Sequence, residues 1–177
     1  MRPTAAALVV GIGAVVTLGT LGVAAWAQHG GHAGHAAPAH DAVACEREFR
    51  EVIAEGRGFG LAFAADKNGY PGPLHVLELK DRLRLSAEQE TRVHALMSAM
   101  FAEARPKGAA LLEAEARLER LFAGGRADEA AVRTAVADVE RARSAVRLVH
   151  LRTHLATRDL LTDAQRRAYH AARWGER

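Results

Sequence analysis

The residues of this 177-residue chain best suited to chemistry are histidines, and they fall into two groups. The first group occupies a stretch of Gly, Ala and Pro near the N-terminus and consists of His29, His32, His35 and His40. Neutral imidazole is a ligand for Zn, Cu and Ni, so this group can capture such ions. Its loose spacing predicts labile binding, because the chain must be ordered around the metal. A tag-like cluster that binds metal only incidentally accounts for the same residues.

The second group lies on a predicted helix. His150 and His154 are four positions apart, which places both imidazoles on one helix face within reach of one ion. His75 is the candidate third ligand of this site, and Glu78 is a weaker one. The alternative is structural. His150 follows Val146 by four positions, so it can lie at the edge of an apolar seam with a backbone or Glu partner.

A third set of residues suits adaptable apolar contacts, and the family resemblance given below implies that they bind unfolded proteins, here called clients. Met97, Met100 and Phe101 lie together on one predicted helix, and methionine adapts to varied apolar surfaces. Arg143 and Arg147 belong to a basic run on another helix, where arginine stems can cover apolar surface while the charge attracts acidic segments. The simpler interpretations are a packed core for the first three residues and a solvated face for the arginines.

Nothing in the sequence predicts an enzyme or an organic cofactor. The spaced glycines at positions 56, 58 and 60 do not form a phosphate-binding loop, because no strand precedes them. No spacing of Ser, His and Asp resembles a nucleophile elbow. The net charge of +3 is too small to indicate a nucleic-acid partner. Cys45 is the only cysteine, so it is free, paired between chains, metal-bound or an unremarkable thiol.

The N-terminal segment has the pattern of an export signal. Arg2 is followed by an unbroken run of apolar and small residues, and Ala25, Trp26 and Ala27 fit a small-x-small cleavage site. We expect a signal peptide over residues 1–27, a disordered His-rich tail over 28–44 and a helical domain over 45–177. The alternative is an uncleaved inner-membrane anchor, since the run is long enough to span a bilayer. Either way, the rest of the chain is expected outside the cytoplasm.

Two similar phrases mark the predicted helix starts. Leu-Ser-Ala-Glu-Gln occupies residues 85–89, and Leu-Thr-Asp-Ala-Gln occupies residues 161–165. Each has the spacing of a capping box, in which a hydroxyl accepts a first-turn amide proton and a Gln reaches back to the cap amide. The four residues concerned are Ser86, Gln89, Thr162 and Gln165. Each box defines a helix start by about 1 kcal/mol.

The apolar spacing predicts an all-α fold without a sheet. Long helices are expected over 87–122, with a kink at Pro106, and over 128–160, each about 50 Å long. The short Gly-Gly turn between them predicts an antiparallel hairpin. Shorter helices are expected from Asp41 onward, from Pro73 to about 85, and after the second box to about Trp174. So thin a body leaves apolar surface exposed, which predicts a homodimer or a surface for apolar partners.

These features together resemble the Spy/CpxP family, which includes zinc-resistance-associated proteins and periplasmic heavy-metal sensors. The resemblance covers about residues 77–174 and rests on the paired L-[ST]-x-x-Q phrases, the long hairpin between them and the export signal. It implies a cradle-like homodimer in the bacterial periplasm. Members hold unfolded proteins without ATP, or bind metal ions and report envelope stress.

We therefore expect an ATP-independent periplasmic chaperone that binds unfolded or misfolded clients, with a metal response. The alternative is a sensor or buffer of Zn, Cu or Ni, in which His150, His154 and His75 bind the ion and signal to a membrane-bound regulatory partner. A nucleic-acid partner is not expected in either case.

Overall fold

The computed structural model describes residues 41–175, and every regular element in that range is a helix. In chain order the helices are α1 (Ala42–Ala54), α2 (Phe63–Asp66), α3 (Pro73–Glu78), α4 (Lys80–Leu83), α5 (Ala87–Ala123), α6 (Glu129–Asp159) and α7 (Asp163–Trp174). The all-α prediction is confirmed for this range. None of these helices is long and apolar enough to cross a membrane. The expected signal peptide, and the tail histidines through His40, lie outside the described residues.

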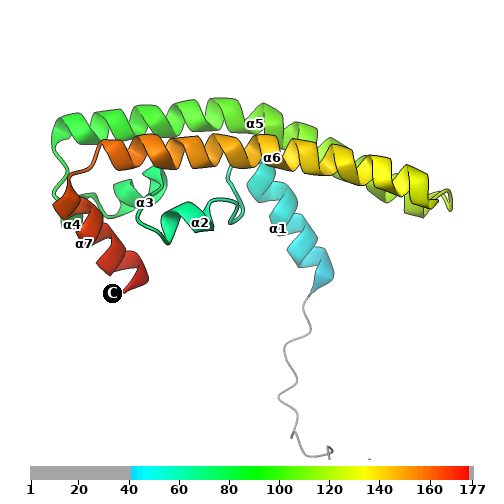
Figure 1. Cartoon of the computed structure of the whole chain (residues 1–177), viewed down its shortest axis with the longest axis horizontal. Coiled ribbons are helices and arrows are strands. Elements are labelled where there is room, and N and C mark those ends of the chain that lie inside the picture. Colours follow the sequence, from blue (N-terminus) through cyan, green and yellow to red (C-terminus); the bar gives the residue numbers. More distant parts are fainter. Residues whose placement is uncertain (1–40, 176–177) are drawn as a thin grey trace, which may run out of the picture. The chain divides into compact units, whose positions relative to one another are not determined.

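Two long helices, α5 and α6, run alongside each other (Figure 1). Their bounds differ from the predicted ones by a single residue at most ends, because the ends are set locally. Asp128 caps α6 by accepting a 2.8 Å hydrogen bond from the amide of Ala131, and Gly125 turns the chain with a φ of 62°. A left-handed φ of this kind is one that glycine adopts without strain.

The two helices are tied together by core contacts and by ion pairs. Glu103 of α5 pairs with Arg152 of α6 at 2.7 Å, and Glu115 of α5 pairs with Arg143 of α6 at 3.1 Å. Glu103 precedes Glu115 along α5, whereas its partner Arg152 follows Arg143 along α6. These pairs are largely exposed, so they add little to stability. The apolar contacts between the helices therefore carry most of the stabilisation.

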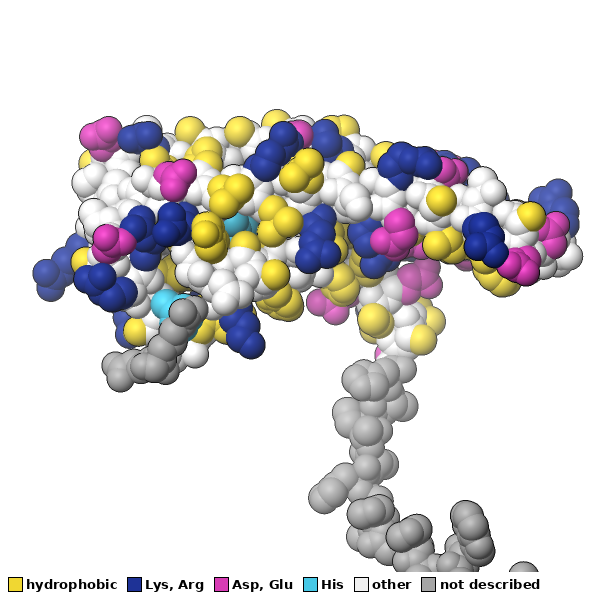
Figure 2. All heavy atoms as spheres, viewed as in Figure 1, with side chains coloured by type: hydrophobic (Ala, Val, Ile, Leu, Met, Phe, Trp, Pro, Cys, Tyr) yellow, Lys and Arg dark blue, Asp and Glu magenta, His cyan; other side chains and the backbone are white. Residues whose placement is uncertain are grey.

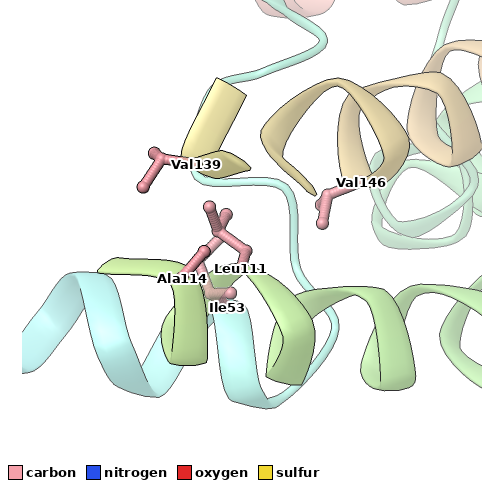
Figure 3. Packing of buried hydrophobic residues seen from close by; sticks show 5 residues of the cluster. All are labelled: Ile53, Leu111, Ala114, Val139 and Val146. Carbon is pink, nitrogen blue, oxygen red and sulfur yellow. The ribbon is translucent and has the colours of Figure 1, made fainter. Parts of the chain in front are cut away.

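One apolar cluster joins α1 to the middle of the long pair. Its buried members are Ile53 of α1, Leu111 and Ala114 of α5, and Val139 and Val146 of α6. Figure 3 shows Ile53, Leu111 and Ala114 close together, with the two valines reaching toward them from α6. The crossing of α1 over α5 is tight.

Gly108 makes this close crossing possible. A Cβ atom at position 108 would lie 2.4 Å from the carbonyl oxygen of Ile53, which is far inside van der Waals contact. Glycine weakens a helix interior by about 1 kcal/mol relative to alanine. At position 108 this loss of helix stability accompanies the close approach of α1, which a larger side chain would prevent. The apolar spacing of the sequence does not reveal that requirement.

Both predicted capping boxes are present. Ser86 Oγ accepts from the amide of Gln89 at 3.1 Å, and Gln89 Oε1 accepts from the amide of Ser86 at 3.0 Å. Thr162 and Gln165 form the same reciprocal pair at 3.2 Å and 2.9 Å. The sequence therefore predicts both helix starts correctly.

The two boxes also meet each other, which the sequence does not predict. The side-chain amides of Gln89 and Gln165 exchange two hydrogen bonds of 2.9 Å. Gln89 Nε2 also donates to the carbonyl of Leu160, and Gln165 Nε2 to that of Leu83. Beside this glutamine pair lies a second apolar cluster, whose buried members are Val76, Leu83, Val93, Leu161 and Tyr169.

Two sequence expectations need adjustment. Helix α1 begins at Ala42 with Asp41 as its cap, so residues 42–44 are helical and do not belong to a tail that ends at 44. The single helix expected from Pro73 to about 85 is divided at Leu79 into α3 and α4. Helix α5 runs through Pro106, in agreement with the single helix expected over residues 87–122.

Candidate functional site

A cavity of about 280 Å³ lies between the long helices and the chain segment 56–75. Its walls come from four regions. They are the end of α1, residues 57–75 with their two short helices, α5 and α6. The lining includes the apolar side chains of Phe59, Phe63, Leu74, Met100 and Phe101. Its polar side chains include His75, His150, His154 and Asp66. The cavity therefore brings three of the predicted metal ligands together with two of the predicted client-binding residues.

His154 is held in one tautomer by a backbone carbonyl. Its Nδ1 lies 2.6 Å from the oxygen of Tyr70, and since a carbonyl only accepts, Nδ1 carries the proton. The neutral ring then presents a lone pair at Nε2. Burial lowers the pKa of His154 more than the Tyr70 hydrogen bond and the charge of Asp66 raise it. The neutral form is therefore favoured in the folded protein.

Gly72 lies directly against this lone pair. A Cβ at position 72 would be 2.9 Å from Nε2 of His154, closer than real Cβ atoms approach a neighbour. Only glycine leaves the nitrogen open at this point of the wall. Within residues 41–175, Nδ1 is the one atom of the His154 ring that makes a hydrogen bond.

His150 lies one turn earlier on the same helix face and is more deeply enclosed. It is 5% exposed, and its Nε2 has no hydrogen-bond partner among residues 41–175. Gly58 covers the ring, since a Cβ there would lie 3.1 Å from Cγ and Cδ2. Burial, and then the neighbouring His154, lower the pKa of His150. A buried ring nitrogen without a partner costs free energy, so this arrangement is unusual in a purely structural core.

His75 is already engaged at both ring nitrogens. Arg173 Nη2 lies 2.8 Å from Nε2, and because a guanidinium only donates, Nε2 is the acceptor. Nδ1 then donates to Glu78 Oε2 at 2.8 Å. His75 can act as a metal ligand only if Arg173 moves away. The sequence gives no sign of this competitor, which lies 98 positions along the chain.

A buried carboxylate fastens the segment 56–75 to α7. Asp66 is 3% exposed; it accepts a hydrogen bond from the Tyr169 hydroxyl and pairs with Arg173 Nε at 3.2 Å. Burial, and then Asp66, raise the pKa of Tyr169, so the phenol stays protonated. Arg173 of α7 therefore contacts two residues that line the cavity, Asp66 and His75.

The predicted metal site is only partly assembled. Within residues 41–175 no group of three or more His, Cys, Asp or Glu side chains has the geometry to hold a metal ion. His150 and His154 share the cavity wall, whereas His75 is held by its partners. His29, His32, His35 and His40 lie outside the described residues. Cys45 is exposed on α1 and is not among the residues that line this cavity.

The predicted client-binding residues separate into two groups. Met100 and Phe101 line the cavity, and Met100 is otherwise packed against Val149. Met97 is half-buried outside the cavity lining. Arg143 is paired with Glu115 and Glu140, so it is part of the contact between the long helices, whereas Arg147 is exposed.

Sequence reasoning missed the aromatic rim of the cavity. Phe59 is 44% exposed, Phe63 62%, Leu74 39% and Trp174 36%, and the rings of Phe63 and Trp174 meet edge to face at 6.4 Å. In the sequence, the pattern that indicates this rim is a set of apolar residues between glycines, as in residues 56–63. A helix-period search passes over them because they follow no helical spacing.

No protein-family model, curated protein or solved structure matches this chain.

Proposed function

We propose that this protein is an ATP-independent chaperone of the periplasm that binds apolar segments of unfolded clients, in the manner of the Spy/CpxP family. The observation that carries the proposal is the set of large apolar side chains that the fold leaves in solvent around one cavity: Phe59, Phe63, Leu74 and Trp174. Contiguous exposed apolar surface on a small protein marks an interaction site. Single exposed residues would not.

The surrounding charges suit transient binding. Lysine and arginine side chains alternate with hydrophobic ones over the face of the molecule seen in Figure 2. Arginine stems can lie along apolar client segments while the charge attracts acidic ones. Once a client folds, its apolar side chains are no longer presented, so it dissociates without nucleotide hydrolysis.

A second row of exposed apolar residues supports a homodimer. Leu148 and Leu155 lie seven positions apart on one face of α6 and are 53% and 52% exposed. We assign this row to a partner copy that covers the outer face of an antiparallel hairpin, giving a cradle-like dimer. Sedimentation velocity tests this assignment, since Leu148→Ser/Leu155→Ser is expected to shift the protein to monomer.

The chaperone proposal is tested by aggregation of a chemically denatured protein in the presence of this one. Equimolar wild type is expected to suppress light scattering, and Phe63→Ser to lose most of that protection. Phe122→Ser is the matched control, because Phe122 is 61% exposed and Phe63 62%, but Phe122 lies at the far end of α5. Unchanged aggregation with wild type, or equal loss in both variants, would contradict the proposal.

Metal sensing is a second candidate, favoured by two imidazoles that share the cavity wall and whose lowered pKa values favour the neutral form. His150 and His154 would bind Zn(II), Cu(II) or Ni(II), with His75 recruited only after Arg173 is displaced. Calorimetric titration of a variant with alanine at the four tail histidines separates this site from the tail. Micromolar binding that is lost in His150→Ala/His154→Ala supports sensing, and absence of binding excludes it.

A further inference from the structure

The two histidines of the cavity wall have more hydrogen-bonding capacity than the described chain uses. Of their four ring nitrogens, only Nδ1 of His154 makes a hydrogen bond within residues 41–175. Both rings are more than nine-tenths buried, at 5% and 8% exposed. Buried polar atoms in native proteins nearly always have a partner. Nε2 of His150 is the one of these nitrogens that is fully enclosed without a partner, whereas Nε2 of His154 is open to solvent and can therefore be reached by a ligand.

The rest of the cavity wall suits an aromatic ring. Phe59, Phe63, Met100 and Phe101 supply apolar and aromatic surface, and sulfur–aromatic and edge-to-face contacts favour a ring over an alkyl chain. An apolar cavity of about 150 Å³ is sufficient for benzene. The 280 Å³ here is sufficient for one substituted ring, but not for a folded element.

The acceptor decides the chemistry of the ligand. Since the Tyr70 carbonyl holds the proton on Nδ1 of His154, Nε2 can only accept. An uncharged aromatic group that carries a hydrogen-bond donor matches both the lone pair and the apolar wall. A carboxylate or phosphate would meet a lone pair and no free donor at this nitrogen.

We propose that the cavity binds a phenol or indole group, with the ring against Phe63, Met100 and Phe101 and its O–H or N–H donated to Nε2 of His154. Such a group has two sources. It is the side chain of a Tyr or Trp in a client, or it is a free small phenol. The client source rests on the proposed function, whereas the free phenol does not.

The first experiment compares p-cresol with 4-methylanisole by calorimetric titration of the full chain. The two molecules have nearly the same ring and size, but the methyl ether cannot donate. One neutral hydrogen bond contributes about 1 kcal/mol net, so p-cresol is expected to bind about fivefold more tightly. Equal affinities, or no binding of either compound, would overturn the proposal.

Two variants assign the preference to His154. His154→Asn keeps an N–H near the position of Nδ1 and removes Nε2, and Gly72→Ala places a methyl group against Nε2 while leaving the histidine in place. Both are expected to bring the affinity ratio to about one, and Gly72→Ala serves if His154→Asn fails to fold. His94→Gln, on an exposed histidine of α5, is the control and is expected to keep the ratio. A ratio retained in both test variants would overturn the assignment.

A peptide pair distinguishes the two sources. Short peptides that differ only in Tyr or O-methyltyrosine are titrated under the same conditions as the two free compounds. A preference for Tyr assigns the site to client side chains, and a preference confined to free p-cresol assigns it to small phenols. No preference in either pair overturns the proposal. Aggregation can go unsuppressed while p-cresol still binds, so failure of the chaperone function is distinguishable from failure of this site.

Discussion

Two polar pairs in this protein, the half-buried Gln89 and Gln165 and the buried His150 and His154, are built in opposite ways. In the glutamine pair, Gln89 and Gln165 bond to each other, to their cap amides and to two backbone carbonyls, so every polar atom of both side chains is used. In the histidine pair, His150 and His154 make one hydrogen bond between them within residues 41–175.

The difference separates stability from binding. A fully satisfied buried network fixes one arrangement of the elements around it, whereas an unsatisfied polar group lowers stability and leaves capacity for a ligand. The glutamine pair joins the starts of α5 and α7 to the ends of the preceding helices. The histidine pair lies in the wall of a cavity that has exposed aromatic residues at its rim.

Breaking the glutamine pair is expected to have the largest effect. Gln89→Leu leaves Gln165, a cap amide and the Leu160 carbonyl without their partner, so the free energy of unfolding should fall by about 3 kcal/mol. Urea unfolding measures it. The double variant Gln89→Leu/Gln165→Leu should be less destabilised than the sum of the two single variants, because it leaves fewer unpaired groups. A loss below about 0.5 kcal/mol would show that the pair is not structural.

Lowering the pH should act on the histidine pair. The folded-state pKa values of His150 and His154 are lowered, chiefly by burial, and the unfolded value is about 6.5. Above pH 6.5 both states are neutral and stability is constant. Below pH 6.5 the two histidines become protonated in the unfolded chain but stay neutral in the folded protein. The free energy of unfolding therefore falls by at most about 1.4 kcal/mol per pH unit for each histidine.

Unfolding measured from pH 7.5 to 5.5 tests this slope. His94→Gln is the control and should leave it unchanged. His150→Leu should reduce it, since one of the two groups is then absent. A slope that is the same in wild type and His150→Leu would mean that His150 is not buried neutral.

Filling the unsatisfied position with an apolar side chain should stabilise the protein. His150→Leu removes a buried nitrogen that has no partner, so the free energy of unfolding at pH 7.5 is expected to rise by about 1.5 kcal/mol. A polar-to-leucine substitution would then stabilise the protein at His150 and destabilise it at Gln89, which distinguishes the histidine pair from the glutamine pair. Destabilisation by His150→Leu would indicate that the ring has a structural partner.

Removing one cap hydroxyl should have the smallest effect. Ser86→Ala loses the hydrogen bond to the Gln89 amide at an exposed helix end, which costs about 1 kcal/mol. Thermal unfolding measures it, and Thr162→Ala should cost a similar amount. If either variant equals Gln89→Leu in its effect, the glutamines add nothing beyond capping.

The features that the sequence predicted are those that depend on near neighbours. The starts of α5, α6 and α7 follow from Ser86, Asp128 and Thr162, whose side chains bond within three residues. Helix α7 ends at Trp174 as expected. Apolar spacing predicted the buried valines of α6, but not that Leu148 and Leu155 lie in solvent, because that depends on which elements cover the helix.

The features that the sequence did not predict depend on contacts between distant segments. The reciprocal bonds of Gln89 and Gln165 span 76 positions, and the competition of Arg173 for His75 spans 98. Gly58 and Gly72 matter only because histidine rings lie over them. The spacing of His150 and His154 correctly placed both on one face, but it could not show that a backbone carbonyl had already taken one nitrogen.

The most direct test of the account is hydrogen exchange of the protein with and without a permanently unfolded client. We expect the client to slow exchange in residues 56–75, which form the rim and one wall of the cavity, and to leave residues 85–93 around the glutamine pair unchanged. Protection that is absent, or that is equal at the glutamine pair and the histidine cavity, would contradict the proposal that the two pairs serve different purposes.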